Sequence, residues 1–302
     1  MRMKVFLTGA TGFVGKGMLA RLREEGHDVV CLVRPGSETK LGCHDEAAGK
    51  ITYAAKDLFH PDSLHEAMAG CDAVIHLVGI IREQPKKGVT FPRIHIEGTK
   101  NVVEAAKQAG VSRFVHMSAL GARENATSAY HKTKYEAEQI VIASGIPFVI
   151  FRPSVIFGPG DEFVNMLADL VRLPVTPVLG SGAYPLQPVA RETVADVFVQ
   201  ALSSPSAANQ IFETGGPEAI TYEHILDHIG AAVGKRSVRK IHIPLSLMKP
   251  VINIMEGFPF FPITNTQLTM LLEGNACKDS EPLYTTFDTP KIEFRQGISQ
   301  YL

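Results

Sequence analysis

A short apolar run at the start of this 302-residue chain leads directly into a glycine loop. The run is Lys4–Leu7, the loop reads Thr8-Gly-Ala-Thr-Gly-Phe-Val-Gly15, and a helical pattern begins at once. Gly9 permits a tight turn, Gly12 lets the main chain approach a diphosphate, and Gly15 lets the helix pack closely on its strand. The helix start adds unpaired N–H groups and the positive end of a dipole. The segment therefore predicts a dinucleotide site; a glycine-rich turn without a ligand is the alternative.

Strand-like apolar runs alternate with helical patterns through the first half of the chain. Several runs are continuously apolar, which is typical of parallel strands covered on both faces. Because strand–helix–strand units are almost always right-handed, the pattern predicts an α/β fold with a doubly wound parallel sheet. The predicted strands are Lys4–Leu7, Asp28–Val33, Ile51–Ala54, Ala73–Leu77, Arg113–Met117, Phe148–Phe151 and a late strand at Ile211–Thr214. The predicted helices are Val14–Glu25, Pro61–Met68, Ile94–Ala109, Ala129–Ser144, Glu162–Leu173 and Glu192–Ser203.

The net charge and the spacing of the cysteines bear on which partners and which compartment are expected. A net charge of -1 gives no support for a nucleic-acid partner, which would favour a basic patch. Cys31, Cys43, Cys71 and Cys277 show no metal-binding spacing, so we expect no metal and a reducing, cytoplasmic compartment. The first residues do not form a signal peptide, and no apolar run reaches the roughly 18 residues of a spanning helix.

The tip of the second predicted strand indicates which nucleotide binds. An acid at this tip would accept from the 2′-hydroxyl of the adenosine ribose, but the sequence from Val33 to Ser37 contains none. Arg34 can make charge-assisted bonds to a 2′-phosphate and Ser37 can add a hydroxyl, which favours NADP over NAD. The alternative is that Arg34 is a solvated surface charge and NAD binds. Asp57 and Leu58 flank the adenine in this interpretation, unless Asp57 merely caps a turn.

A group of three residues in the middle of the chain is suited to hydride transfer at a carbonyl or an alcohol. Tyr130 and Lys134 share one face of a predicted helix, and Ser118 follows the fifth strand at the edge where open sheets bind ligands. We predict that Tyr130 moves the proton, that Ser118 holds the substrate oxygen, and that Lys134 also bonds the nicotinamide ribose. A tyrosinate base near neutral pH needs a pKa about 3 units below ~10. We expect the Lys134 ammonium and an oxidised nicotinamide to lower that pKa.

These motifs resemble the short-chain dehydrogenase/reductase superfamily in its extended or atypical, epimerase/dehydratase-like branch. The resemblance rests on the glycine loop, Ser118 and Tyr130-His-Lys-Thr-Lys134, with support from Gly98-Thr-Lys-Asn-Val102. Within that branch, His116-Met-Ser-Ala-Leu-Gly-Ala122 and the run from Phe151 to Asp161 are similar to the group of the nucleotide-binding accessory subunit of mitochondrial complex I.

The resemblance implies a Rossmann core and a small, mostly helical C-terminal substrate lobe. We expect the core at residues 1–160, with return elements at about 189–216, and the lobe at 161–188 and 217–302. It also implies backbone contacts to the diphosphate from the start of the first helix, to the ribose from the end of the fourth strand, and to the nicotinamide from the segment after the sixth strand. The expected cofactor residues are Gly9, Thr11, Gly12, Phe13, Val14, Gly15, Arg34, Ser37, Asp57, Leu58, Val78, Gly79, Tyr130, Lys134, Pro153, Val155 and Ile156.

The chain departs from the family pattern at two places. His95 stands where extended members usually carry an asparagine that holds the active-site lysine through water, and we expect a partly exposed helix histidine there. The fourth strand ends His76-Leu-Val-Gly79, where many sugar-nucleotide epimerases carry two alanines. This difference argues against a nucleotide-sugar substrate. The apolar stretch Ile241–Thr264 is expected to form the core of the lobe, or else a surface for an apolar ligand or a membrane.

The sequence therefore predicts an NAD(P)-dependent oxidoreductase or epimerase/dehydratase-like enzyme acting on a small molecule, apolar or quinone-related. The alternative is an NADPH-binding assembly or regulatory protein with little turnover, which would associate with a protein complex. A weak association with a membrane surface is a further expectation. By analogy with relatives, the protein is expected to be a monomer or a homodimer formed through the helices at Ile94–Ala109 and Ala129–Ser144.

Overall fold

The computed structural model describes residues 2–37, 41, 50–258 and 263–302. Cys43 and residues 259–262 of the apolar stretch Ile241–Thr264 lie outside these ranges. The chain divides into two compact units. The first comprises Met1–Arg152, Val194–Phe212 and Glu281–Thr289, and the second comprises Pro153–Thr193, Glu213–Ser280 and Pro290–Leu302.

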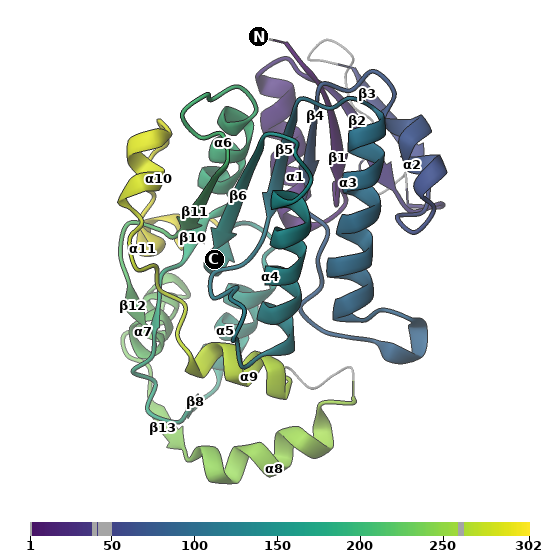
Figure 1. The fold of residues 1–302 in the computed structure, drawn as a ribbon. Coiled ribbons are helices and arrows are strands. Elements are labelled where there is room, and N and C mark those ends of the chain that lie inside the picture. The colour runs from purple at the N-terminus through teal and green to yellow at the C-terminus, as the bar shows by residue number, and fades with distance from the viewer. Residues whose placement is uncertain (1, 38–40, 42–49, 259–262) are drawn as a thin grey trace. The chain divides into compact units, whose positions relative to one another are not determined.

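The first unit is built on a seven-stranded sheet with the order β11-β6-β5-β4-β1-β2-β3, in which the strands from β6 to β3 all pair in parallel (Figure 1). The strand order 3-2-1-4-5-6 is that of a Rossmann sheet. The chain adds strands outward from β1 to β3 and then in the opposite direction from β4 to β6, so the direction of winding reverses between β1 and β4. The predicted doubly wound α/β fold is therefore confirmed. The strands are β1 (Lys4–Thr8), β2 (Asp28–Val33), β3 (Ile51–Ala55), β4 (Ala73–His76), β5 (Arg113–Met117), β6 (Phe148–Pro153) and β11 (Gln210–Thr214).

Helices cover both faces of this sheet, which explains why its strands are continuously apolar. Side chains alternate along a strand, so Phe6 and Phe114 join one core, into which α2, α3 and α4 also send apolar residues. Figure 1 shows these three helices in front of the sheet and α1 behind it. The helices of this unit are α1 (Phe13–Glu24), α2 (Pro61–Met68), α3 (Gly98–Gln108), α4 (Ala129–Ile142), α6 (Arg191–Ala201, whose first three residues belong to the second unit) and α10 (Glu281–Thr286).

An aromatic cluster joins three distant parts of the chain inside the first unit. The ring of Phe151 on β6 stacks on Phe198 of α6, with 4.5 Å between the centroids. Phe287, which follows α10, lies 5.6 Å from Phe151 and 5.2 Å from Phe212 of β11. The side chain of Gln200 also exchanges two hydrogen bonds with the backbone of Asp288. Residues near the C-terminus therefore complete the core of the N-terminal sheet.

The second unit combines short strand pairs with helices around a core that includes Phe157, Leu167, Tyr222 and Phe294. Its strands form the pairs β10-β7, β12-β9 and β13-β8. They are β7 (Ile156–Phe157), β8 (Thr176–Leu179), β9 (Pro185–Leu186), β10 (Val189–Ala190), β12 (Ile220–Thr221) and β13 (Lys240–Ile243). The helices are α5 (Glu162–Arg172), α7 (Tyr222–Ala232), α8 (Leu245–Met255), α9 (Asn265–Leu272) and α11 (Phe294–Ile298).

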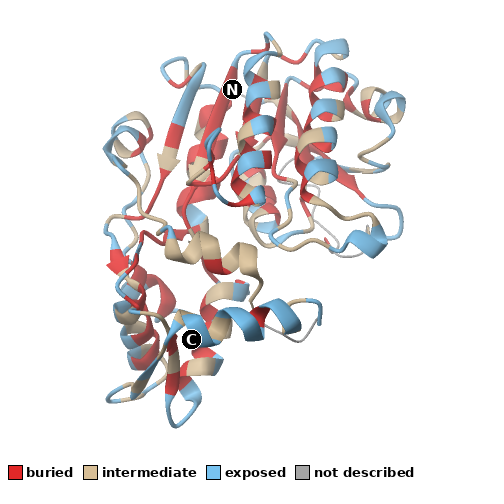
Figure 2. Ribbon diagram, turned by 60° about the horizontal axis from the view of Figure 1, so that its bottom comes forward, coloured by how far each residue is buried: buried red, intermediate tan, exposed pale blue. Residues whose placement is uncertain are grey.

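Two local expectations are wrong. The helix predicted at Ile94–Ala109 begins earlier, as a π-helical turn at Pro92–Glu97 that leads into α3. The apolar stretch from Ile241 is not a lobe core along α8, because Ile252 is the one residue of that helix that is buried. Figure 2 shows α8 largely in the colour of exposed residues. Among the described residues, no helix is long and apolar enough to cross a membrane.

Gly15 packs closely as predicted, but against the loop residues Gly9 and Ala10 rather than the strand, and this contact gives a stability test. A Cβ added there would lie 2.1 Å from the carbonyl oxygen of Gly9 and 2.7 Å from Cα of Ala10. In an open helix, glycine-to-alanine substitution stabilises by about 1 kcal/mol. We expect Gly15→Ala instead to destabilise by about 3 kcal/mol, because the clash is with backbone that cannot rotate away. Urea unfolding measures the difference, and Gly257→Ala, whose Cβ meets nothing within 4 Å, is the control. An unchanged midpoint for Gly15→Ala would contradict the packing.

Candidate active site

The glycine loop joins β1 to α1 at the point where the winding of the sheet reverses. Gly9 has a left-handed backbone (φ 77°), and its carbonyl accepts the N–H of Gly12 at 3.0 Å. A Cβ on Gly9 would lie 3.2 Å from Cβ of Leu77, so the loop runs against the end of β4. Gly12 is the N-cap of α1 and offers no side-chain oxygen to the first turn, which also contains no acid. The helix end is thus suited to an external anion, as a dinucleotide diphosphate requires.

Thr11, Phe13 and Val14 lie in the same loop and first turn, each half-buried. At the tip of β2, Arg34 is exposed, and the N–H of Ser37 donates to the Arg34 carbonyl at 2.9 Å. The tip is therefore a turn that presents the guanidinium to solvent, with no acid between Val33 and Ser37.

Asp57 and Leu58 have local roles in the structure. The Asp57 carboxylate accepts the N–H of Phe59 at 3.1 Å, which is the turn-capping arrangement considered above as the alternative. Leu58 packs on α3, where a Cβ on Gly98 would lie 2.8 Å from its Cδ2. These contacts fix the segment after β3 and leave a role toward adenine as a prediction.

Ser118 and Lys134 meet at the carboxyl end of β5. The Nζ of Lys134 donates to the carbonyl of Met117 at 2.8 Å. The next residue, Ser118, donates its backbone N–H to Phe151 at 2.8 Å, and its side chain is 2% exposed. Within the described ranges, its Oγ has no hydrogen-bond partner. A buried hydroxyl without a partner is costly, so a substrate oxygen would satisfy it.

Tyr130 lies one helical turn before Lys134, among aromatic rings. Its ring makes edge-on contacts with Phe91 at 5.8 Å and His95 at 5.5 Å between centroids. Burial raises the pKa of Tyr130 to about 12 and lowers that of Lys134 to about 8. The expectation that Lys134 lowers the tyrosine pKa is wrong for the protein without cofactor, because desolvation of the phenolate dominates. Tyr130 therefore holds its proton at neutral pH.

His95 is not the partly exposed histidine that we expected, because it is 1% exposed. The N–H of Ile80 donates to its Nε2 at 3.1 Å, so Nδ1 carries the proton and donates to Thr133 Oγ1 at 2.9 Å. The Thr133 hydroxyl in turn donates to the carbonyl of Ala129 or Tyr130, each at 3.0 Å. The π-helical turn adds a residue to the helix and so re-aims this side chain. His95 thereby ties the segment after β4 to the turn of α4 that carries Tyr130.

A second buried histidine, His76, joins the ends of β1, β4 and α3. Thr8 Oγ1 accepts the N–H of Leu77 at 3.2 Å and is hydrogen-bonded to His76 Nδ1 at 2.7 Å. The other ring nitrogen of His76, Nε2, is hydrogen-bonded to Thr99 Oγ1 at 3.1 Å. His116 stacks on His76 with 5.4 Å between ring centroids. Sequence reasoning assigned no role to His76 or His116, although a histidine inside an otherwise apolar strand is a visible signal.

The segment after β4 approaches Lys134 closely at Gly79. A Cβ on Gly79 would lie 3.1 Å from Lys134 Nζ and 3.6 Å from His95 Nε2, so only glycine leaves this space open. Val78, beside it, is half-buried. The first unit thus brings together the glycine loop, Gly79, Ser118, Tyr130 and Lys134 along one sheet edge, where β1, β4 and β5 end.

Pro153, Val155 and Ile156 belong to the second unit. Pro153 is buried at the end of β6, and the N–H of Val155 donates to Asn275 Oδ1 at 2.9 Å. Ile156 pairs with Val189 in the parallel pair of β7 and β10. The structure fixes their backbone locally, and their contact with a cofactor stays a prediction.

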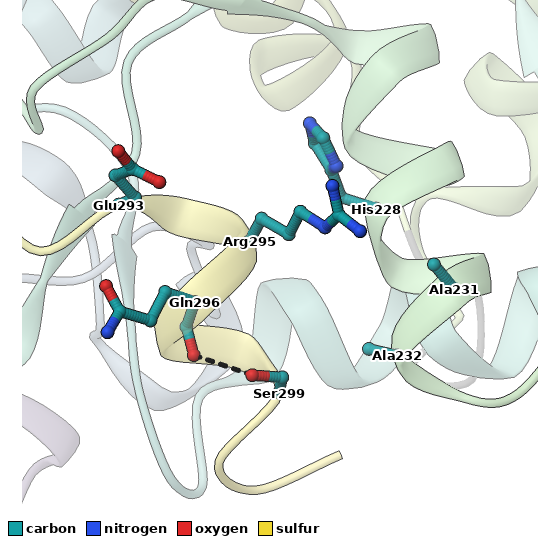
Figure 3. A pocket seen from close by; sticks show the side chains of 7 residues that line it. All are labelled: His228, Ala231, Ala232, Glu293, Arg295, Gln296 and Ser299. Atoms are coloured by element: carbon teal, nitrogen blue, oxygen red, sulfur yellow. Dashed lines mark hydrogen bonds between the residues drawn. The ribbon is translucent and has the colours of Figure 1, made fainter.

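The second unit also contains a pocket of about 390 Å³ between α7 and α11. Figure 3 shows Arg295 extended toward His228 across it, and Ser299 bonded to the backbone of Gln296. None of the predicted site residues lines this pocket. Over the described ranges, no group of His, Cys, Asp and Glu residues could hold a metal ion.

The fold and the glycine loop together define an NAD(P)-binding protein of the Rossmann type. More narrowly, the chain belongs to the NAD dependent epimerase/dehydratase family, whose model matches residues 5–213. This agrees with the resemblance to extended short-chain dehydrogenases/reductases.

Two related proteins and one solved structure show what the chain is similar to. The chain is 28% identical to the mitochondrial NADH-ubiquinone oxidoreductase 40 kDa subunit of Neurospora crassa, over 84% of this chain and 66% of that protein. It is 34% identical to the ceramide reductase of Caulobacter vibrioides, over 58% of this chain and 53% of that protein. It therefore spans less than two thirds of the length of either relative. The Thermus thermophilus UDP-glucose 4-epimerase, solved with NAD, superposes with a TM-score of 0.73 at 20% identity, over 98% of this chain and 97% of that one.

The buried histidines predict a pH dependence of stability. Burial, with the charge of Lys134, lowers the pKa of His76 to about 3 and that of His95 to about 2, from 6.5 when unfolded. As the pH falls, these histidines take up protons in the unfolded chain before they do so in the folded protein, which favours unfolding. The stability that the neutral histidines contribute is therefore complete above pH 6.5 and is lost progressively below it. Each of these two buried histidines should lower the free energy of unfolding by about 1.4 kcal/mol for every pH unit below 6.5. Urea midpoints between pH 7.5 and 5 measure the slope, which His95→Asn should reduce and His60→Asn, on an exposed histidine, should not. Equal slopes in both variants would contradict the assignment.

Proposed function

We propose that this chain is an NADP(H)-dependent oxidoreductase that reduces a carbonyl group on an apolar, lipid-like substrate. The observation that carries the proposal is the buried Ser118 hydroxyl without a partner, beside Lys134 and on the same sheet edge as the glycine loop. The residues fit a dinucleotide, because the start of α1 has neither a side-chain cap nor an acid in its first turn. Bound NADPH would supply the hydride to the carbonyl carbon.

The protein's own residues supply the remaining steps. Ser118 Oγ would donate to the substrate oxygen and fix its position. Tyr130, protonated at neutral pH because its pKa is about 12, would give its proton to that oxygen as the carbon accepts hydride. Lys134 keeps its ammonium below about pH 8 and would stabilise the tyrosinate left behind. Product alcohol and oxidised cofactor then leave, and solvent reprotonates Tyr130. A tyrosine that begins protonated favours the reductive direction.

The relatives support an apolar substrate. Ceramide, named for the Caulobacter vibrioides reductase, is a lipid, and the Neurospora crassa subunit is named for a ubiquinone reductase. We also propose a reducing, cytoplasmic location, which the free thiols of Cys31, Cys71 and Cys277 support. NADP rather than NAD is supported by Arg34 and the lack of an acid at the tip of β2.

A second candidate is an NADPH-holding subunit of a protein complex. It is favoured by the similarity to the Neurospora crassa subunit, which extends over 84% of this chain. Bound NADPH that no carbonyl substrate oxidises would favour this second function.

Replacement of Tyr130 tests the chemistry. We expect Tyr130→Phe to lower kcat for reduction of a lipid ketone about 10²- to 10⁴-fold, because no group then delivers the proton. The dissociation constant of NADPH should change little, as measured by cofactor fluorescence. Tyr135→Phe, on the same helix, is the matched control and should keep full turnover. If Tyr130→Phe turns over like the control, the assigned acid is wrong.

Replacement of Arg34 tests the choice of nucleotide. We expect Arg34→Ala to weaken NADPH binding about 10- to 100-fold, since a charge-assisted bond to the 2′-phosphate is lost. NADH, which has no such phosphate, should bind as before. Lys107→Ala, which removes an exposed cation of α3, should leave both cofactors unaffected. Equal losses for NADPH and NADH would show that Arg34 does not recognise the phosphate.

A further inference from the structure

Large apolar side chains that face solvent are concentrated in one short part of the second unit. Across the described ranges ten such residues are exposed, and five of them lie between Ile241 and Phe258. Single exposed apolar residues need no explanation, but a group of them marks a surface that is covered in use.

Four of these residues form one stripe along α8 and its end. Leu247, Val251, Ile254 and Phe258 follow at intervals of four, three and four residues, with exposures of 64%, 43%, 73% and 49%. At 3.6 residues per turn, the three that belong to α8 (Leu247, Val251 and Ile254) fall within about 60° of arc, and Phe258 follows beyond the last helical residue, Met255. Ile252, the buried residue that fixes α8, lies about 130° from the centre of this apolar stripe. The stripe therefore faces away from the side by which the helix is held.

The segment that carries the apolar stripe is rich in positive charge. Residues 235–258 contain five Lys or Arg residues and a single acid, Glu256, in a chain whose net charge is -1. The Glu256 carboxylate accepts the N–H of Asn265 at 2.9 Å. Arg236, Arg239 and Lys249 are exposed. A segment that combines an apolar stripe with a surplus of cations matches acyl chains beneath anionic headgroups, which is the pattern of segments that lie in a membrane interface.

The length of α8 fits this arrangement. Its 11 residues extend for about 16 Å, roughly half of what a bilayer core of about 30 Å requires. The helix can therefore lie on a membrane surface but cannot cross it.

We propose that the apolar stripe and the cations of the same segment, residues 235–258, dock this chain on an anionic lipid bilayer. The inference deepens the proposed function and rests on it in one respect, that an apolar substrate partitions into the same bilayer. The docking itself requires neither cofactor nor turnover.

Vesicle flotation of the full chain tests the docking. Vesicles of phosphatidylcholine alone are compared with vesicles that also contain phosphatidylglycerol, at low and high salt. We expect the protein to float with the anionic vesicles and to be released by salt. Leu247→Ser with Ile254→Ser should lower the bound fraction roughly tenfold, because the apolar contact is lost. Arg236→Gln with Arg239→Gln should abolish the preference for anionic vesicles. The control, Ile142→Ser with Ile211→Ser, removes two exposed apolar side chains of the first unit and should float like the wild type.

A spectroscopic readout guards against a folding artefact. The chain contains no tryptophan, so Leu247→Trp introduces a single reporter. Its emission should shift to the blue on addition of anionic vesicles, whereas that of Ile211→Trp, in the first unit, should not.

Three results would overturn the docking. The wild type could remain soluble with both kinds of vesicle, or the double serine variant could float as well as the wild type. Alternatively, light scattering could show a dimer that the serine variant dissociates, which would make the apolar stripe an interface between copies. Failure of the proposed function is distinguishable, because a protein that floats but reduces no carbonyl loses the chemistry alone.

Discussion

The buried ammonium of Lys134 is the group on which the candidate site depends. A charge in a dry site costs several kcal/mol unless partners compensate for the lost water. Here the Met117 carbonyl accepts from Nζ, and Glu138, one turn along α4, favours the charged form. Glu138 is itself held by Arg152 through two hydrogen bonds of 2.8 and 2.6 Å. The position of the lysine is therefore fixed from β5, α4 and β6 together.

The same charge governs the histidines around it. His76, His95 and His116 are all buried, and the Lys134 ammonium adds to the desolvation that keeps them neutral. Neutral imidazoles can both donate and accept, and the backbone N–H of Ile80 selects the tautomer of His95 that carries its proton on Nδ1. The site gains directional hydrogen bonds without further positive charge, which would otherwise repel the ammonium and an oxidised nicotinamide.

Much of the fold followed from local patterns. The strand Asp28–Val33 is one uninterrupted apolar run after its first residue, and its predicted limits are those of β2. The helix that carries Tyr130 and Lys134 was predictable from its spacing, with Gly145 beyond its end. The burial of His95 was not predictable, because it depends on a π-helical turn that hydrophobic periodicity does not reveal. The raised pKa of Tyr130 was missed because it depends on rings from Phe91 and His95, brought there by tertiary packing. The lobe core predicted around α8 was wrong for a related reason, because an apolar sequence looks the same whether its side chains face a core or a surface.

The cluster around Phe151 has a consequence for how the molecule is made. Phe212 and Phe287 complete that cluster, and they come from late parts of the chain. During synthesis, the face of β6 that carries Phe151 therefore stays incompletely covered until the ribosome has produced most of the protein. A fragment cut where the family match ends, at residue 213, would lack Phe287 and leave the same aromatic surface open. The family match therefore ends well before Phe287, the residue that completes the aromatic core of the sheet.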